Sequence, residues 1–301
     1  MSADAAPTLP HLLSIVAGAL LPFFDTPSAA TLRLVSQDFL AAVSAHQWED
    51  RRTTVRGRLA AWRACFPRAR AVNLRGTAVT DADCAALTGV RDVCLASCPR
   101  ITDAAFAHLA GVQTLSLAYC TQEAITDAAF APLRGLRRLV LSGCTQPSLT
   151  DSALAPLQGT LTSLTMDYCT QFSDALLARC GAALRSLSIK WCVQEDLTDA
   201  AFAPLRCLQA LDMSHCRQAT ITDAGLLQLR GTLQELHMNG CYQATITPAL
   251  FPHLRQLKVL DMRICRGAVR AAAAAAGLPL VGGGQQQRSA REQRGRAAAK
   301  A

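Results

Sequence analysis

The chain has 301 residues, of which 50% are hydrophobic and only 5% are aromatic, so it can bury a continuous core of aliphatic side chains. Its formal net charge is +8, but residues 266–301 alone hold seven basic residues against one acidic residue. Most of the net positive charge therefore belongs to the C-terminal end, while residues 72–265 are close to neutral and offer no broad basic surface for a nucleic-acid backbone.

Residues 1–8 are expected to be flexible, and a mostly apolar stretch runs from Leu9 to Phe24. This stretch is shorter than the roughly 20 residues that a transmembrane helix needs. It is also not preceded by the Lys or Arg that begins a signal peptide. We interpret it as a helix that neighbouring elements cover.

A second amphipathic helix is expected over residues 29–43. The preceding Asp-Thr-Pro-Ser cluster is typical of a helix start, and apolar side chains recur at helical spacing from Leu32 to Val43. The sequence therefore predicts a small helical domain over residues 9–50.

Residues 51–71 form a basic connector with seven arginines. Leu59, Trp62 and Phe66 recur at helical spacing, which predicts a helix whose apolar face packs on the element that follows. We interpret the arginines as a solvated helix face, with a nucleic-acid-binding patch as the alternative.

Residues 72–267 repeat the phrase Leu-x-Leu-x-x-Cys, in which Val, Ile or Met can replace Leu. Its cysteines follow one another at intervals of 22 to 25 residues, and they are Cys98, Cys120, Cys144, Cys169, Cys192, Cys216, Cys241 and Cys265. An earlier copy has Thr77 in the cysteine slot, which makes nine units. A second phrase, Thr-Asp or Ser-Asp, follows most copies at a nearly constant distance. This period with two phase-locked motifs is typical of a leucine-rich-repeat solenoid.

Each repeat is predicted to contain a short strand with inward leucines, then a turn, then a short helix. The Thr is expected at the helix N-cap, and the Asp in the first turn of a helix of about two turns. A glutamine two residues after most cysteines is expected to form a structural ladder. The fold class that follows is α/β: a horseshoe-shaped solenoid of about nine units behind a helical N-terminal domain.

One inward cysteine per repeat suits a small buried hydrophobe. Such a ladder lacks the paired geometry of a disulfide framework, and its cysteines have no partners at zinc-binding spacing. We therefore predict reduced core thiols, and with them a cytoplasmic or nuclear protein.

The residues before the repeats resemble an F-box, a match that covers about forty residues of the chain. The resemblance rests on Leu9-Pro10, the apolar run after it, Asp25, the phrase from Leu32 to Ser36, and Trp48. The chain departs from the family pattern in a longer first helical segment that Pro22 interrupts, and in Asp38, which replaces a basic residue. The repeats resemble the cysteine-containing leucine-rich repeats of F-box proteins, in a slightly shortened form.

This resemblance implies that the N-terminal helices dock on a Skp-type adaptor of a cullin ubiquitin ligase, while the repeats hold a target protein. The adaptor-binding candidates that it implies are Leu9, Pro10, Leu12, Leu13, Ile15, Val16, Leu32, Leu34, Val35, Phe39 and Trp48. The alternative is that these helices only cap the open end of the repeat core, as every repeat array requires.

We find no glycine-rich phosphate loop, no His-Glu-x-x-His and no nucleophile elbow in the sequence, so we predict neither enzyme activity nor a metal or cofactor. A binding surface is favoured instead, because the outward strand positions and the position before each cysteine become charged or aromatic in the later repeats. The target-binding candidates are Tyr119, Asp167, Tyr168, Lys190, Trp191, Asp212, His215, His237 and Asn239. The alternative for the aromatic residues is packing against the next repeat.

Residues 268–301 begin with an alanine-rich run that is predicted to close the repeat array. The Gly-, Gln- and Arg-rich remainder is expected to be disordered. Its basic residues are scattered, which favours a solubilising tail over a nuclear-import or RNA-contacting arm.

Overall fold

The computed structural model describes residues 19–21 and 24–281, and the chain forms two compact units, Met1–Leu136 (unit 1) and Arg137–Ala301 (unit 2). Most of the predicted first helix and the basic tail lie outside the described residues. Among the residues that are described, no helix has the length and apolar character needed to cross a bilayer.

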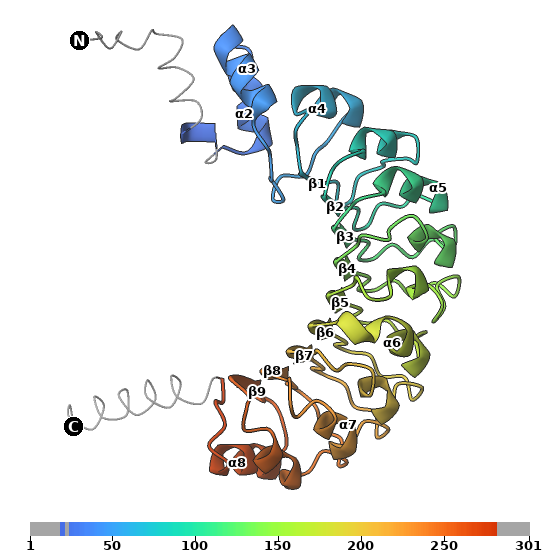
Figure 1. Ribbon diagram of the computed structural model, residues 1–301, viewed down its shortest axis with the longest axis vertical. Coiled ribbons are helices and arrows are strands. Elements are labelled where there is room, and N and C mark those ends of the chain that lie inside the picture. The colour runs from blue at the N-terminus through green and yellow to red at the C-terminus, as the bar shows by residue number, and fades with distance from the viewer. Residues whose placement is uncertain (1–18, 22–23, 282–301) are drawn as a thin grey trace, which may run out of the picture. The chain divides into compact units, whose positions relative to one another are not determined.

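Unit 1 begins with helices and continues into repeats, with 3-10 helices labelled η (Figure 1). Its elements are α2 (Thr26–Leu32), α3 (Gln37–Ala45), α4 (Leu59–Cys65), β1 (Ala71–Asn73), η2 (Asp83–Leu87), β2 (Asp92–Cys94), α5 (Asp103–Phe106), η3 (Ala107–Leu109), β3 (Thr114–Ser116) and η4 (Asp127–Phe130).

Unit 2 consists of repeats closed by a C-terminal helix. Its elements are β4 (Arg138–Val140), η5 (Ala155–Leu157), β5 (Ser163–Thr165), α6 (Asp174–Cys180), η6 (Gly181–Ala183), β6 (Ser186–Ser188), η7 (Asp199–Phe202), β7 (Ala210–Asp212), α7 (Asp223–Leu227), β8 (Glu235–His237), η8 (Pro248–His253), β9 (Val259–Asp261) and α8 (Gly267–Ala275).

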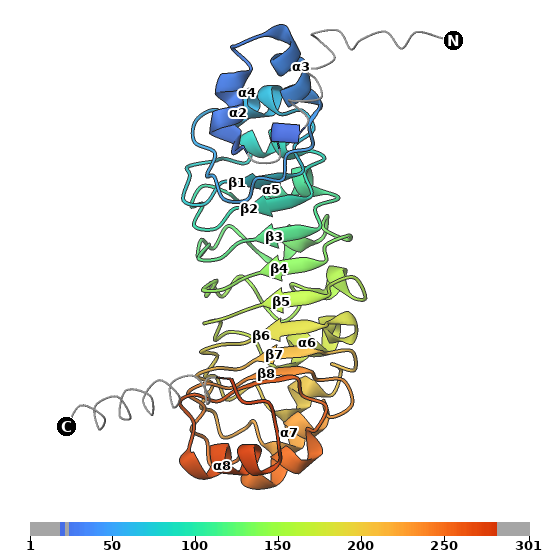
Figure 2. The same cartoon turned by 90° about the vertical axis from the view of Figure 1, so that its left-hand side faces the viewer.

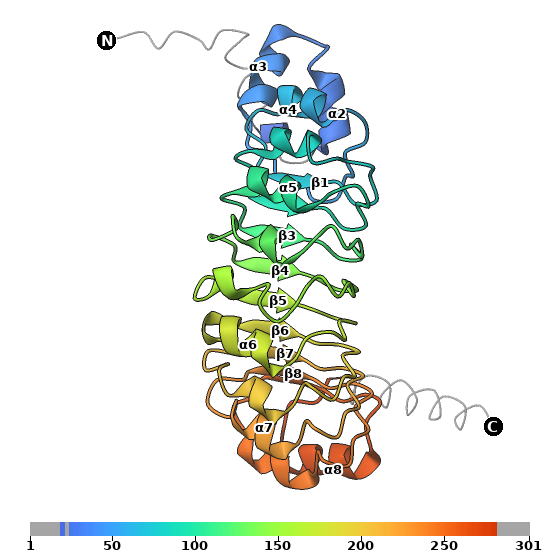
Figure 3. The same cartoon turned by 90° about the vertical axis from the view of Figure 1, so that its right-hand side faces the viewer.

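In each unit the strands pair in parallel and in chain order, β1 to β3 in unit 1 and β4 to β9 in unit 2. In unit 2 the strands β4 to β7 lie toward the viewer in Figure 2, and α6 and α7, on the other side of the sheet, lie toward the viewer in Figure 3. The register aligns the buried middle residues, which are Val72, Val93 and Leu115 in unit 1 and Leu139, Leu164, Leu187, Leu211, Leu236 and Leu260 in unit 2. The predicted α/β solenoid of strand–turn–helix repeats is confirmed.

The helical segments of the repeats are shorter than the two turns that the sequence predicts in most units. Those after Asp127 and Asp199 end at Phe130 and Phe202, two residues before a proline. Proline lacks the N–H that would continue the hydrogen-bond pattern, so the chain leaves the helix there.

The predicted N-caps are confirmed at Thr102, Thr126, Ser173, Thr198, Thr222 and Thr247. Thr198 Oγ1, for example, accepts a hydrogen bond from the backbone N–H of Ala200. The prediction is wrong for Thr80 and Thr150, because η2 begins after Ala82 and η5 after Leu154.

The neighbouring aspartates have a second role that the sequence did not reveal. Six carboxylates also accept from the backbone N–H (2.7–2.9 Å) and the hydroxyl (2.5–2.7 Å) of the Thr or Ser one repeat later. They belong to Asp81, Asp103, Asp151, Asp174, Asp199 and Asp223. Each of these aspartates therefore joins one repeat to the next.

The repeat cysteines also form hydrogen bonds that join one repeat to the next. Seven thiols donate to the carbonyl of the residue that directly follows the strand of the preceding repeat, at 2.9–3.2 Å, and they are Cys98, Cys120, Cys169, Cys192, Cys216, Cys241 and Cys265. The amides of Gln122, Gln171 and Gln194 also donate to carbonyls of the preceding repeat, which confirms the expected glutamine ladder at these positions.

The prediction of one helix over residues 29–43 is wrong, because the chain breaks into α2 and α3. Leu34 and Val35 lie in the turn between them, and Ser36 caps α3 by accepting from the N–H of Phe39 at 3.2 Å. The serine hydroxyl offers the backbone a local partner that competes with a continuous helix.

The predicted connector helix is confirmed as α4, with Leu59, Trp62 and Phe66 buried. Its Arg63 guanidinium donates to the carbonyls of Ala69 and Thr88, so this arginine belongs to the repeat junction and not to a free basic patch. The expected closing helix is present as α8, which packs against η8.

We predict that Asp199→Ala lowers the free energy of unfolding by about 2–3 kcal/mol, because two hydrogen-bond donors of Thr222 lose a charged acceptor. The exposed Asp196 is the matched control, and its replacement by Ala is expected to change stability by less than about 0.5 kcal/mol. Urea denaturation measures both. A loss below about 1 kcal/mol for Asp199→Ala would leave only a helix-terminus effect.

We also predict alkaline destabilisation. Burial raises the pKa of the Cys120 thiol to about 11 and those of Cys192 and Cys241 to about 12, from an ordinary value of 9.0. The stability that comes from keeping these thiols neutral is complete below pH 9 and is lost as the pH rises toward 12. The free energy of unfolding should therefore fall between pH 9 and pH 11, and Cys192→Ser should make that fall less steep. Identical pH slopes for the two proteins would contradict this account.

Candidate functional site

The residue before seven of the eight repeat cysteines, all except Cys265, adopts a left-handed backbone conformation, which turns the chain just after the strand. In unit 2 this position is held by Gly143, Tyr168, Trp191, His215 and Gly240, with φ between 58° and 72°. We call these five residues the corner column. A positive φ costs a non-glycine residue about 1 kcal/mol or more. The three ring-bearing residues keep this conformation and place their rings side by side at the end of the strands.

The three rings of the corner column form a stack. The rings of Tyr168 and Trp191 have centroids 5.9 Å apart at an interplanar angle of 10°, and those of Trp191 and His215 are 4.1 Å apart at 9°. A Cβ atom at Gly240 would lie 2.4 Å from Nδ1 of His215, so glycine leaves room for the last ring. Tyr168 and Trp191 nevertheless keep 47% and 37% of their surface exposed to solvent.

Arginine contributes to this surface as well. The Arg217 guanidinium lies 5.9 Å from the ring centroid of Trp191 and 5.5 Å from that of Tyr242, whose side chain is 45% exposed. Both distances are within the range of a cation–π interaction. The sequence analysis missed Arg217 and Tyr242, although both directly follow a repeat cysteine and the period alone places them beside the corner column.

The strand face next to the stack carries a row of charges. The Lys190 ammonium lies 3.4 Å from a carboxylate oxygen of Asp167 and 3.6 Å from one of Asp212. Asp167 also accepts from the Ser188 hydroxyl and the Lys190 backbone N–H, and Asp212 accepts from the N–H of Ser214. Burial lowers the pKa of Lys190, but the two carboxylates raise it by more, so the ammonium stays charged.

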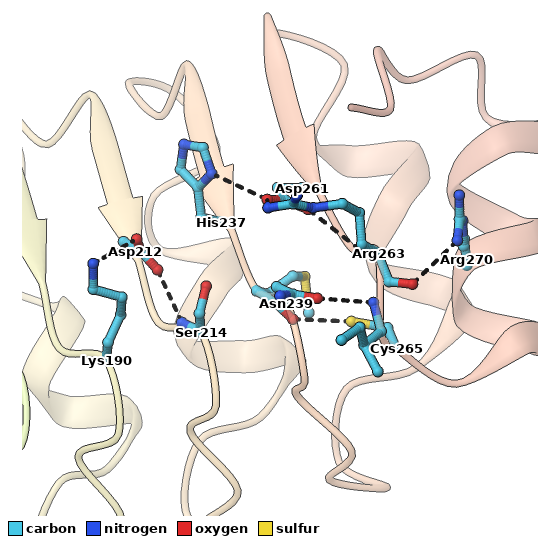
Figure 4. Close-up of polar contacts among 11 residues, drawn as sticks. Lys190, Asp212, Ser214, His237, Asn239, Asp261, Arg263, Cys265 and Arg270 are labelled. Atoms are coloured by element: carbon cyan, nitrogen blue, oxygen red, sulfur yellow. Dashed lines mark hydrogen bonds and ion pairs between the residues drawn. The ribbon is translucent and has the colours of Figure 1, made fainter. Parts of the chain in front are cut away.

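A second charged cluster follows on β8 and β9 (Figure 4). Arg263 donates twice to Asp261, at 3.0 and 2.8 Å, and His237 Nδ1 lies 3.9 Å from the same carboxylate. Burial raises the pKa of Asp261, while the hydrogen bonds from Arg263 lower it by more, so the net shift is downward. Asn239 accepts from the backbone N–H of Ile264 and thereby holds the next corner in place.

The structure thus brings most of the predicted target-binding residues into two adjoining groups on unit 2. The ring stack and the Lys190 row form the first, and His237 and Asn239 lie beside the second. Tyr119 lies on unit 1 and is 53% exposed. Within the described residues, no group of three or more His, Cys, Asp or Glu side chains is arranged to hold a metal ion. The surface that results offers exposed aromatic rings and paired charges.

The predicted adaptor-binding residues separate into four groups, of which Trp48 alone forms the last. Leu9, Pro10, Leu12, Leu13, Ile15 and Val16 lie outside the described residues. Leu32 and Phe39 are half-buried, whereas Leu34 and Val35 are 86% and 68% exposed.

Trp48 lies in the core of unit 1 and not on its surface. Its indole N–H donates to the Val43 carbonyl at 2.8 Å, and its ring packs edge-on against Phe66 at 5.4 Å. A side chain that is only 2% exposed supports the surface above it and does not itself contact a partner.

No protein-family model matches this sequence, and no curated protein matches it. Solved structures do match. TLR13 in complex with ssRNA13 aligns with a TM-score of 0.55 and 20% identity over 73% of this chain. The mouse RP105/MD-1 complex gives 0.52 and 19% over 68%, and the internalin InlF of Listeria monocytogenes gives 0.50 and 15% over 73%. All three are leucine-rich-repeat proteins.

This chain has the leucine-rich-repeat fold. The match covers 31% of the TLR13 chain and 36% of the RP105 chain, so this chain spans about a third of their length, against 68% for the internalin. At these identities the likeness is one of fold alone. The fold does not identify the function of this leucine-rich-repeat protein, which depends on its own side chains.

We predict that Trp191→Ala lowers the free energy of unfolding by about 1–2 kcal/mol, because the central ring of the stack is lost between Tyr168 and His215. Tyr242→Ala is the control, since its ring lies outside the stack, and it should cost less. Urea denaturation of both variants measures the difference. Equal losses would mean that the stack adds no stability and that Trp191 acts only as a contact residue.

Proposed function

We propose that this leucine-rich-repeat protein is a substrate adaptor of a Skp–cullin–F-box type ubiquitin ligase. Its N-terminal helices would dock on a Skp-type adaptor, and the strand face of unit 2 would bind a target protein. The observation that carries the docking role is the pair Leu34 and Val35, two large apolar side chains that project into solvent from the turn between α2 and α3. They stand within the phrase that resembles an F-box, and adjacent exposed apolar side chains are typical of an interaction site.

The target role rests on the ring stack and the charged row of unit 2. Exposed Tyr and Trp beside Lys and Asp are the side chains in which binding hot spots are enriched. Asp167, Asp212 and Asp261 offset the charges of Lys190, Arg217 and Arg263 on this surface, so it offers no excess of positive charge to a phosphate backbone, which favours a protein over RNA.

A second function is supported by the position of Trp48. Its carbonyl accepts from the N–H groups of Arg70 and Ala71, where the chain enters β1. The helices before the repeats are therefore bonded into the first repeat, as a simple cap would be. The alternative is a protein-interaction module without a role in ubiquitin transfer.

A pull-down with a purified Skp-type adaptor distinguishes the ligase adaptor from the plain interaction module. Because Trp48 belongs to the core of unit 1, truncating the N-terminus would disturb the fold, so point variants of the full chain are preferable. We predict that the double variant Leu34→Asp, Val35→Asp weakens adaptor binding by roughly tenfold or more, as for the loss of an apolar anchor. The control is Val281→Asp, at a 42% exposed residue of unit 2.

Three outcomes are distinct. Adaptor binding that is lost in the double variant and kept in Val281→Asp supports the adaptor role. Equal binding by wild type and double variant would move the docking surface away from this turn. If a cooperatively folded wild-type chain does not bind the adaptor, the ligase role is excluded. The N-terminal helices are then only a cap, and the protein is an interaction module.

A further inference from the structure

The exposed apolar side chains of unit 2 are concentrated beside the repeat cysteines. Six large apolar side chains are exposed on the described part of this unit, and five of them directly precede or follow a repeat cysteine. These five are Tyr168, Trp191, Val193, Tyr242 and Ile264. Val193 and Ile264 keep 48% and 53% of their surface exposed. Exposed apolar side chains that gather on one part of a protein are typical of an interaction site.

The register of the strands continues through the corner, so these side chains of successive repeats are neighbours. The backbone N–H of each corner residue donates to a carbonyl of the next repeat, as from Trp191 to Ser214 at 3.1 Å and from His215 to Asn239 at 2.8 Å. We call the corner column and Ile264, together with the residue after each repeat cysteine of unit 2, the turn surface. The residues after the cysteines are Thr145, Thr170, Val193, Arg217, Tyr242 and Arg266.

The turn surface is positively charged. It contains Arg217 and Arg266, which are both exposed, and it contains no Asp or Glu. The adjoining strand segments are different, because between the start of each strand and the corner three basic side chains stand against four acidic ones. These are Arg138, Asp167, Lys190, Asp212, Glu235, Asp261 and Arg263. A negatively charged group is therefore favoured at the turn surface over the strand face.

Arg217 is the charge at the centre of the exposed apolar side chains. Its guanidinium lies over the rings of Trp191 and Tyr242, at 5.9 and 5.5 Å from their centroids. No carboxylate among the described residues forms an ion pair with it. A guanidinium donates hydrogen bonds in its own plane, so contact of its face with a ring leaves its donors available. The rings thus hold Arg217 in place for an acceptor from outside the chain.

We propose that the turn surface binds a segment of the target protein in which an Asp or Glu stands beside apolar side chains. The carboxylate accepts from the Arg217 guanidinium, and the apolar side chains pack on Trp191, Val193 and Tyr242. Trp, Tyr and Arg are the residues in which binding hot spots are enriched, and a guanidinium can donate two parallel hydrogen bonds to one carboxylate. This inference rests on the proposed function only in that unit 2 binds a protein.

The chain contains three tryptophans, which suits fluorine NMR of protein labelled with 5-fluorotryptophan. Trp48 and Trp62 are buried in unit 1 and serve as internal controls, while the Trp191 signal is assigned from Trp191→Phe. The full chain is titrated with the peptide acetyl-Ser-Leu-Glu-Phe-Ser-amide. Three matched peptides carry Gln in place of Glu, Lys in place of Glu, or Ser in place of both Leu and Phe.

We expect the glutamate peptide to shift the Trp191 signal saturably while the signals of Trp48 and Trp62 stay in place. The glutamine peptide should bind roughly two- to fivefold more weakly, the factor expected for an exposed ion pair. The lysine peptide should bind more weakly still, because its charge has the sign of Arg217. The peptide without Leu and Phe should also lose affinity, because it buries less apolar surface. Sodium chloride should reduce the advantage of glutamate over glutamine.

Variants of Arg217 test the assignment of the carboxylate partner. Arg217→Gln should bind the glutamate and glutamine peptides equally, and Arg217→Lys should keep part of the preference, because the charge remains while the planar fork is lost. Arg230, an exposed arginine just after α7, is the matched control. Arg230→Gln changes the net charge by the same amount and should keep the full preference. Thermal melting verifies that each variant is folded.

Four results would overturn the proposal. They are no Trp191 shift in a folded chain, equal affinity for the glutamate and glutamine peptides, a glutamate preference that persists in Arg217→Gln, or binding to a membrane surface instead. The last is tested with vesicles of equal parts phosphatidylserine and phosphatidylcholine. A Trp191 shift with these vesicles and with none of the peptides would replace the protein partner by a lipid surface.

None of these results bears on the Skp-type adaptor, which is assigned to Leu34 and Val35 of unit 1. A chain that binds the adaptor and ignores the glutamate peptide removes the turn-surface proposal alone. A chain that binds the glutamate peptide and not the adaptor removes the ligase role and leaves the turn surface as a binding site.

Discussion

Each repeat of this chain depends on its neighbour for the hydrogen-bond partners of its buried polar groups. An aspartate accepts from the Thr or Ser of the following repeat, and a cysteine thiol donates to a carbonyl of the preceding one. Buried donors and acceptors without partners are costly, so a single repeat is not a stable unit. The hydrogen bonds act together with the aligned leucines, and they fix the register in which one repeat meets the next.

That register creates the candidate site. Equivalent positions of adjacent parallel strands lie about 4.8 Å apart, close to the spacing of stacked planar rings. Ring-bearing residues at the same position of successive repeats therefore meet face to face, as Tyr168, Trp191 and His215 do. The same spacing places Lys190 between two carboxylates one repeat away on either side. Residues at the same position of successive repeats, which are far apart in the sequence, thus become neighbours on one surface.

The N-terminal helices are bonded to the first repeat and also present exposed apolar side chains. Trp48 and Phe66 pack together where the chain enters the first strand, as in a cap. Leu34 and Val35 project from the turn on the same unit. A cap fixes these helices to the repeats, and a rigid support is what an interaction surface needs in order to bind without a large loss of entropy.

The sequence by itself determined the repeat period, the inward leucines and cysteines, most of the threonine N-caps and the connector helix. These features depend on local preference and on periodicity, which a linear pattern carries in full. It also placed Tyr168, Trp191 and Lys190 on the strand side of the repeats.

Only the tertiary structure decided how these residues are used. It made the aspartates links between repeats, because their partners lie more than twenty residues away along the chain. It broke the expected helix at Ser36, where a side-chain hydroxyl competes with the backbone. It buried Trp48, and it set the ring of His215 against the backbone of Gly240. Burial and contact depend on which side chains meet across repeats, and that information is absent from any single repeat.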